Sequence, residues 1–206
     1  MLTQKQLILL SVFVPNLFKE YSFSELKRAL AEKSNSVLQN ALKQFKSENL
    51  VVERSMGTSK LYKINLDNNL VFDYIGIINK GKLSKQVERT ISLIKEEVDK
   101  YTFFYSVVIF GSWAVGEERK DSDLDIAVFI EKDEDKKKVE SALNSAEQKS
   151  LIKLDSHVIS QDEFLEMLRL DEENLGKEIA RKHLVVHNSK LFYSVLIKGV
   201  KNGFKL

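Results

Sequence analysis

The sequence contains no cysteine, a single proline and no long hydrophobic run. The lack of cysteine excludes disulfide bonds and thiolate metal sites, and it favours a reducing compartment, so we expect a cytoplasmic protein. No segment approaches the roughly 20 apolar residues that a membrane-spanning helix needs. The N-terminus, which reads MLTQKQLILLSVF, also lacks the basic start and long apolar stretch of a secretory signal peptide.

Charge of neither sign dominates, since the 206 residues carry a formal net charge of +2. Residues 1–82 contain 12 Lys and Arg against 7 Asp and Glu, whereas residues 83–206 contain 20 against 23. A mildly basic first part fits contact with an anionic partner, and a mildly acidic second part fits metal binding. Ordinary scatter of surface charge explains the same balance equally well.

The first 66 residues are expected to form three helices followed by a β-hairpin. Pro15 ends the first helix, and Ser22 or Ser24 caps the second. The third follows Ser34-Asn35-Ser36, and then the apolar period changes from helical spacing to alternation. The predicted elements are helices over 3–14, from 22 and from 36, then strands over 49–54 and 60–66.

This order of elements resembles the winged helix-turn-helix family in pattern, without a diagnostic motif. The resemblance implies a recognition helix from residue 36 and a wing formed by the hairpin. Four cations on these two elements are candidates for contact with nucleic-acid phosphates. They are Lys43, Lys46, Arg54 and Lys60. The alternative is a small domain that packs on its neighbour or dimerises.

The rest of the chain begins with two helices, over about 68–80 and 85–100, and then alternates strands with helices. Strands are predicted over 104–110, 123–130, 151–160 and 184–186, and helices over 133–149, 161–170, 173–182 and 189–201. We place the domain boundary near Gly81. The predicted domains are residues 1–82, with a linker helix, and residues 83–206.

A strand that runs directly into Gly111-Ser112 is the first chemical signal. Glycine allows a phosphate to approach the backbone closely, and the exposed N–H groups at a helix start favour an anion. The Ser112 hydroxyl supplies one more donor. The pair is therefore a candidate binding site for the phosphates of a nucleotide.

A pair of carboxylates on the next strand is the second signal. Asp123 and Asp125 lie two residues apart, so both point to one face of the strand. Adjacent carboxylates repel each other unless a cation lies between them, and Mg²⁺ prefers oxygen ligands. Asp155 on the following strand is expected to face the same cleft. It would take a proton from an attacking hydroxyl or share a second metal.

These residues resemble the polymerase-beta type nucleotidyltransferase superfamily, most closely its minimal members. The matching pattern is Gly111-Ser112, then ten residues, then Asp123-x-Asp125, with Asp155 as a third acid on a later strand. The close match covers about 20 residues. The resemblance implies an α+β fold, in which a winged helix precedes a nucleotidyltransferase domain with a mixed sheet and helices mainly on one face.

The resemblance also implies a Mg²⁺-dependent enzyme that moves a nucleoside monophosphate from NTP, with ATP favoured, to a hydroxyl of an acceptor. Asp123, Asp125 and Asp155 would then be the catalytic and metal-binding residues. Candidate nucleotide-binding residues are Gly111, Ser112, Ser122, Arg119 and Lys120.

One residue departs from the family pattern. Minimal members often carry Arg just before the second glycine, where this chain has Val115. A cation for the triphosphate would then come from Arg119 or Lys120, or be missing. Trp113 either stacks on a base or lies against a domain interface, and His157 either shares the cleft or is a surface residue.

Three functional hypotheses stay open at this point. The acceptor of an active enzyme is a protein, an RNA end or a small molecule, and some minimal relatives are antitoxins that nucleotidylate a partner toxin. The alternative is a winged-helix transcriptional regulator with a nucleotide-sensing or inactive nucleotidyltransferase domain. A third possibility is an enzyme that also represses its own operon.

Overall fold

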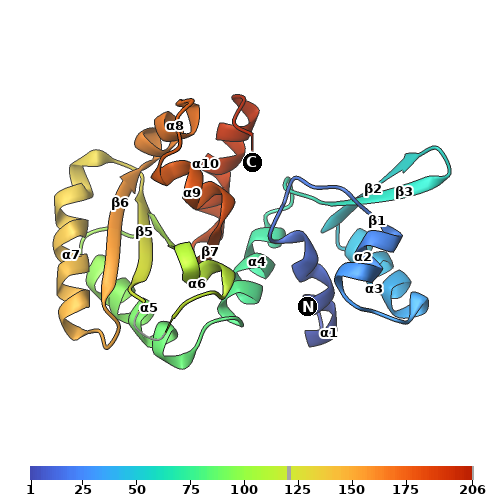
Figure 1. Cartoon of the computed structure of the whole chain (residues 1–206), viewed down its shortest axis with the longest axis horizontal. Coiled ribbons are helices and arrows are strands. Elements are labelled where there is room, and N and C mark those ends of the chain that lie inside the picture. Colours follow the sequence, from blue (N-terminus) through green and yellow to red (C-terminus); the bar gives the residue numbers. More distant parts are fainter. Residues whose placement is uncertain (120–121, 206) are drawn as a thin grey trace. The chain divides into compact units, whose positions relative to one another are not determined.

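The computed structural model describes residues 1–119 and 122–205. The chain divides into two compact units, Met1–Ile78 and Asn79–Leu206, whose helices and strands are labelled in Figure 1. Within the described residues, no helix is both long and apolar enough to cross a membrane. The domain limits suggested by the sequence, 1–82 and 83–206, stay a prediction.

The first unit combines short helices with a small antiparallel sheet (Figure 1). In chain order its elements are α1 (Gln4–Leu10), η1 (Ser11–Phe13), β1 (Tyr21–Ser22), α2 (Phe23–Ala29), α3 (Asn35–Ser47), β2 (Val51–Met56) and β3 (Ser59–Ile64). Ser22 caps α2, because its hydroxyl accepts a hydrogen bond from the Glu25 N–H while the Glu25 carboxylate accepts one from the Ser22 N–H. Ser34 caps α3 through the N–H of Val37. The three predicted helices and the hairpin are confirmed.

The sheet of the first unit has the strand order β1-β3-β2. Strands β2 and β3 form the hairpin, which turns at Gly57 with a φ of +60° that glycine adopts without strain. Strand β1 is only two residues long and pairs Tyr21 with Tyr62. Alternation cannot be read from two residues, so the sequence pattern missed this strand.

The boundary between the units falls inside α4 (Leu70–Lys80). Asn79, the first residue of the second unit, is fully buried. Its side-chain amide donates a hydrogen bond of 3.1 Å to the carbonyl oxygen of Val185 within the same unit.

The second unit is a four-stranded sheet with helices around it (Figure 1). After α4 its elements are α5 (Lys85–Val98), β4 (Tyr105–Phe110), α6 (Gly111–Val115), β5 (Leu124–Ile130), η2 (Asp133–Asp135), α7 (Lys136–Lys149), β6 (Leu154–Ser160), α8 (Gln161–Arg169), α9 (Leu175–Arg181), β7 (His183–His187) and α10 (Ser189–Lys201). The strand order is β6-β5-β4-β7. β5 and β6 are parallel and the other pairs are antiparallel, so the sheet is mixed, as expected.

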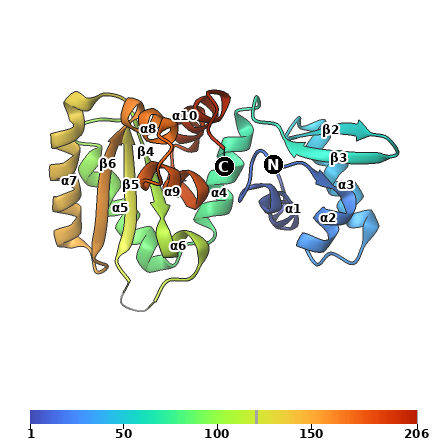
Figure 2. The ribbon, with the colours of Figure 1, turned by 45° about the horizontal axis from the view of Figure 1, so that its top comes forward.

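Helices cover both faces of this sheet (Figure 2). One face packs on α5 and α7 through a cluster that includes Ile109 and Ile126. Phe129 points to the opposite face, where its ring contacts Phe164 of α8 and Phe192 of α10 at centroid separations of 4.8 and 5.0 Å. The expectation of helices mainly on one face is therefore wrong. Nearly every residue of β4 and β5 is buried, which is the pattern of strands covered on both sides.

The predicted elements of the second unit are all present, with several boundaries shifted by one to three residues. β5 begins at Leu124 rather than at Asp123, so Asp123 lies one residue before the strand. β6 begins at Leu154 rather than at Leu151, and Leu151 is 76% exposed. The preceding turn is closed locally, because the Ser150 hydroxyl bonds both the N–H and the carbonyl of Ile152. Those backbone groups bond within the turn rather than with β5.

Candidate functional site

Three strands begin or finish side by side at one end of the second unit's sheet. β4 ends at Phe110, while β5 and β6 begin at Leu124 and Leu154 at the same edge, since Ile109 pairs with Ile126 and Asp125 pairs with Asp155. Leu124 and Leu154 point into the cluster with α5 and α7. Alternation therefore turns the carboxylates of Asp125 and Asp155 to the opposite face, beside each other on neighbouring strands.

Gly111 lies directly against Asp125. Its φ is +64°, a conformation that favours glycine. A Cβ atom placed on Gly111 would lie 2.9 Å from the Cγ atom of Asp125 and would overlap the Oδ2 oxygen of that carboxylate. Two structural features therefore favour glycine at this position, its positive φ and the close approach of the Asp125 carboxylate. The second feature brings the Gly-Ser turn at the start of α6 into contact with that carboxylate.

Asp125 is half-buried among other acids. Burial raises its pKa above the usual 3.8, and repulsion from the carboxylates of Asp155, Glu178 and Asp123 raises it further, in that order, against a smaller opposing effect of His157. Glu178 thus acts on Asp125 more strongly than Asp123 does, although Asp123 is only two residues away. The acids on β5, β6 and α9 therefore share one charged site that excess negative charge destabilises.

The other two acids have basic neighbours. Lys153 places its Nζ atom 2.7 Å from Oδ2 of Asp123, and the proximity raises the pKa of Lys153. His157 places Nε2 3.3 Å from Oδ1 of Asp155. Trp113 donates its indole N–H to the carbonyl oxygen of Asp123 at 2.9 Å and packs against the core of this unit. That contact ties α6 to the start of β5.

Within the described residues, no three acidic or histidine side chains lie close enough together to hold a metal ion. The chemistry of the donors nevertheless fits a hard divalent cation. All three aspartates offer oxygen ligands. Burial and then repulsion from neighbouring carboxylates raise the pKa of Asp125, and such a cation would relieve the repulsion. Asp123, Asp125 and Asp155 are therefore suitable ligands by type, although they do not lie together as a finished set.

The remaining nucleotide-binding candidates lie on the segment between α6 and β5. Ser122 accepts a hydrogen bond of 2.9 Å from the Arg119 N–H, and its own N–H bonds the Arg119 carbonyl oxygen. Arg119 is exposed, and Lys120 lies outside the described residues. Val115 is 42% exposed and supplies no charge. Ser112 lies in the first turn of α6, one residue after the glycine that contacts Asp125.

Sequence reasoning missed two charged residues of this site, Lys153 and Glu178. Lys153 had a local signal, since it precedes the strand that carries Asp155 by one residue. Glu178 had none, because α9 reaches the acids only through the tertiary fold. His183 follows α9, pairs with Phe110 at the end of β4, and bonds the carbonyl of Ile179 through Nδ1 at 2.8 Å. These contacts hold the last turn of α9 at the end of the sheet where the acids lie.

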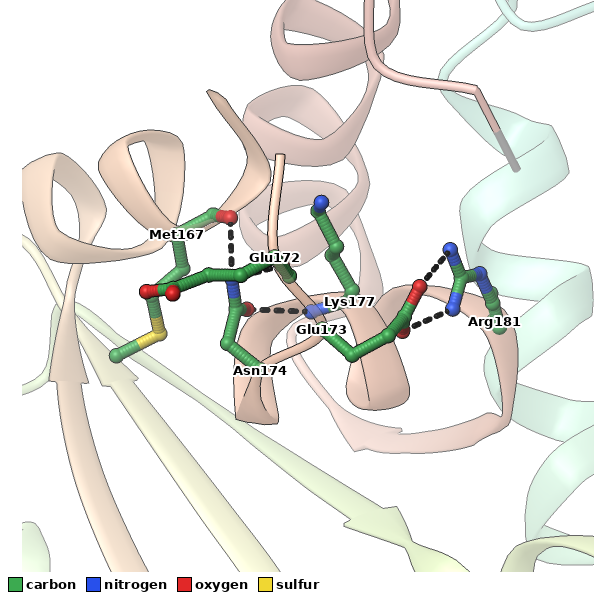
Figure 3. Close-up of polar contacts among 6 residues, drawn as sticks. All are labelled: Met167, Glu172, Glu173, Asn174, Lys177 and Arg181. Atoms are coloured by element: carbon green, nitrogen blue, oxygen red, sulfur yellow. Dashed lines mark hydrogen bonds and ion pairs between the residues drawn. The ribbon is translucent and has the colours of Figure 1, made fainter. Parts of the chain in front are cut away.

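Polar contacts also hold the start of α9 in place (Figure 3). Asn174 caps the helix by accepting from the Lys177 N–H at 3.1 Å and donates to the Met167 carbonyl of α8 at 2.8 Å. Glu173 and Arg181 pair along the exposed side of the helix. A Cβ on Gly176 would lie 2.5 Å from the Cβ of Met167, so α9 packs closely on α8 at this glycine.

The four candidate cations of the first unit lie on α3 and the hairpin, and three of them are paired. Lys46 and Lys60 both contact Glu53, at 2.6 and 2.8 Å, and they lower the pKa of that carboxyl to about 2. Arg54 contacts Glu20 at 2.6 Å. Among the described residues, Lys43 makes no ion pair. The structure therefore offers one unpaired cation from this set.

Residues 92–191 match the family model described as "Polymerase beta, Nucleotidyltransferase". The match begins within α5, ends at the start of α10 and includes Gly111 and the three aspartates. It supports the polymerase-beta type superfamily for this part of the chain, and with it a nucleotidyltransferase. No curated protein and no solved structure matches the chain.

Proposed function

We propose that the protein is a Mg²⁺-dependent nucleotidyltransferase that moves a nucleoside monophosphate from NTP, with ATP favoured, to a hydroxyl of an acceptor. The observation that carries this proposal is the contact between Gly111 and the Asp125 carboxylate, with Asp123 and Asp155 at the same sheet edge. A glycine turn for phosphates and a cluster of carboxylates are the two parts that this chemistry needs. The family match over 92–191 supports the same reaction class.

In the proposed reaction, the acceptor oxygen attacks the α-phosphorus of the nucleotide. A new bond forms between that oxygen and phosphorus, the bond from phosphorus to the bridging oxygen breaks, and pyrophosphate leaves with the electron pair. Asp155, the most exposed of the three aspartates, takes the proton of the acceptor hydroxyl. Gly111 and Ser112 provide backbone and hydroxyl donors for the triphosphate.

Asp123, Asp125 and Asp155 would hold the metal ion. When bound, Mg²⁺ would neutralise charge on the phosphates and on the carboxylates around Asp125. Lys153 is a positively charged residue of the chain at the same site. Its pair with Asp123 is 73% exposed on the lysine side, so it is weak enough to exchange Asp123 for a phosphate oxygen. We infer that Lys153 supplies the cation that Val115 does not.

The direct test uses ATP labelled either at the α-phosphate or at the γ-phosphate, with Mg²⁺ and candidate acceptors that include proteins encoded next to this chain. We expect the α label, and not the γ label, to appear on an acceptor. Asp125→Asn should abolish the transfer, whereas Asp162→Asn, an exposed aspartate at the start of α8, should not. Equal transfer by both variants, or transfer of the γ label, would refute the proposal.

The alternative function is a winged-helix regulator, with residues 1–82 as the DNA-binding domain and the second part sensing nucleotide. The order of α1, α2, α3 and the β2–β3 hairpin favours it, because it is the order of a winged helix. The pairing of Lys46, Lys60 and Arg54 with acids weakens it.

A gel-shift series at rising salt separates the two functions. If the first unit binds DNA, Lys43→Ala should reduce the slope of log affinity against log salt by about 1, because one phosphate contact is lost. Glu53→Gln should tighten binding, since it leaves two lysines free. The absence of any shift at low salt, even for Glu53→Gln, would count against the regulator.

A further inference from the structure

A groove of about 530 Å³ runs along the free edge of β6. Four consecutive residues of β6, from Ser156 to Ile159, line it. Successive side chains of a strand point to opposite faces, so a surface that touches all four must lie along the strand's edge rather than on one face. One wall comes from α7, with Glu140 and Asn144, and the other from α8 and α9. The backbone edge of β6 therefore forms part of the groove.

The backbone of β6 is unpaired on this side. β6 is the terminal strand of its sheet and pairs only with β5. Apart from the ladder with β5, no backbone hydrogen bond among the described residues joins residues 155–159 to another segment. Outward N–H and C=O groups of such a strand offer a template for another extended chain. Here the template lies between two helices, which would restrict how a chain can enter.

The two ends of the groove differ. At the end of β6, Lys136 of α7 forms an ion pair with Glu163 of α8, and both residues line the groove. Near the middle of β6, His157 lines the groove and contacts Asp155, which lies next to the start of the strand, just outside the lining. The groove thus leads from an ion pair that joins its walls to the aspartate that we propose as proton acceptor.

We propose that this groove binds an extended peptide segment of an acceptor protein, which adds to β6 as a further strand and presents a hydroxyl side chain beside Asp155. This inference rests on the proposed transfer reaction and names its acceptor. A residue paired with Asp155 would point its side chain to the same face, on a strand about 4.8 Å away. Main-chain bonds to residues 156–159 would supply the affinity.

The arrangement explains how the reaction would be directed. On one face of the sheet, Asp125 and Asp155 lie on neighbouring strands, and the acceptor residue would come next in the row. Its hydroxyl proton passes to Asp155, and its oxygen bonds the α-phosphorus as pyrophosphate leaves. A protein segment in strand conformation fits this geometry because the row is set by strand pairing.

The charge of the groove indicates which acceptor segments would bind best. Lys136 and Glu163 neutralise each other, whereas Glu140 is exposed and has no ion-pair partner among the described residues. Glu140 therefore gives the groove a net negative charge, and Asp155 adds negative charge beside it. A segment with Lys or Arg beside its hydroxyl residue complements this charge.

The first test measures peptide binding in the full chain without ATP. The probe is a short peptide of alternating valine and lysine with one central serine or tyrosine. The control peptide carries N-methyl groups on alternate amides, so it cannot pair as a strand. We expect the first peptide to slow hydrogen exchange of the outward-facing amides among residues 156–159 at least about tenfold, as two hydrogen bonds of about 1 kcal/mol each imply. The control should have no effect. Equal protection by both peptides, or by neither, overturns the inference.

A matched pair of variants on α7 tests the groove itself. Asn144 lines the groove and Gln148, one turn later on the same helix, does not. Both are exposed, so tryptophan at either position should leave the fold intact. Asn144→Trp should weaken peptide binding at least about tenfold by filling the groove, and Gln148→Trp should not. If the two variants bind alike, the peptide binds elsewhere and the proposal fails.

The inference and the proposed function can fail separately. If nucleotide is transferred to a small alcohol but no peptide protects residues 156–159, the proposed enzyme activity stands and the groove is not the acceptor site. If the peptide protects these residues but no hydroxyl receives a nucleotide, the groove is a peptide-binding site and its role in binding an acceptor is refuted. Protection of residues 156–159 that rises with protein concentration alone would show that a second copy of this chain fills the groove instead.

Discussion

Replacing Gly111 with alanine tests the contact on which the site is built. Two effects are expected, and Gly116 separates them. Both glycines have positive φ, +64° and +73°, so alanine at either position should cost about 1–2 kcal/mol of stability. Only at Gly111 does the added Cβ meet an obstacle, the carboxylate of Asp125, whereas nothing lies within 4 Å at Gly116.

The obstacle is the end of a half-buried side chain, so the carboxylate would rotate away rather than unfold the protein. We therefore expect Gly111→Ala and Gly116→Ala to lose similar stability, within about 0.5 kcal/mol of each other. Their activities should differ widely. Displacing a reacting group by about 1 Å costs on the order of a hundredfold in rate, so Gly111→Ala should lose at least that much, and Gly116→Ala only a few-fold.

Chemical denaturation gives the stabilities, and transfer of α-labelled nucleotide gives the activities. The pKa of Asp125, measured by NMR, provides an independent readout, because rotation towards solvent should lower it in Gly111→Ala alone. Equal activities, or an unchanged Asp125 pKa in Gly111→Ala, would show that the contact has no part in the site.

Three further predictions concern charge. Lys153→Met should change stability by less than about 0.5 kcal/mol, since its pair with Asp123 is exposed, yet it should raise the KM for NTP; an unchanged KM removes Lys153 from the site. Asp125→Asn should raise the melting temperature at neutral pH but not in acid. The pKa of Asp125 is raised in the folded state, so its charged form destabilises the fold once the pH exceeds that pKa. Mg²⁺ should therefore stabilise the native chain and not the variant. The pKa of His183, lowered by burial from 6.5 to about 4, predicts that stability is intact above pH 6.5 and falls by up to about 3 kcal/mol towards pH 4. His183→Gln should flatten that part of the stability curve, and an unaltered curve would contradict the assignment.

Local sequence determined much of the fold. Ser22 and Ser160 each precede a glutamate by three residues, and both form capping boxes at the starts of α2 and α8. Apolar periodicity located the helices, the hairpin and the strands that carry the acids. These features depend on residues within one or two turns of each other, so the sequence expresses them directly.

Features that depend on distant partners were not readable in this way. β1 exists because Tyr21 pairs with Tyr62, and the second helical layer exists because both faces of β4 and β5 are apolar. The latter had a signal in the continuous apolar runs of these strands, which favours two covered faces over one.

The candidate site divides along the same line. The sequence by itself determined the Gly111-Ser112 turn and the strand that carries Asp125, because glycine adopts the positive φ of that turn without strain and an apolar run predicts the strand. Only the tertiary structure decided the charges around them. It placed Glu178 near Asp125, Lys153 on Asp123 and the open edge of β6 beside Asp155. The physical reason is that electrostatic interaction depends on distance in space, which strand register and helix packing set and which spacing along the chain does not record.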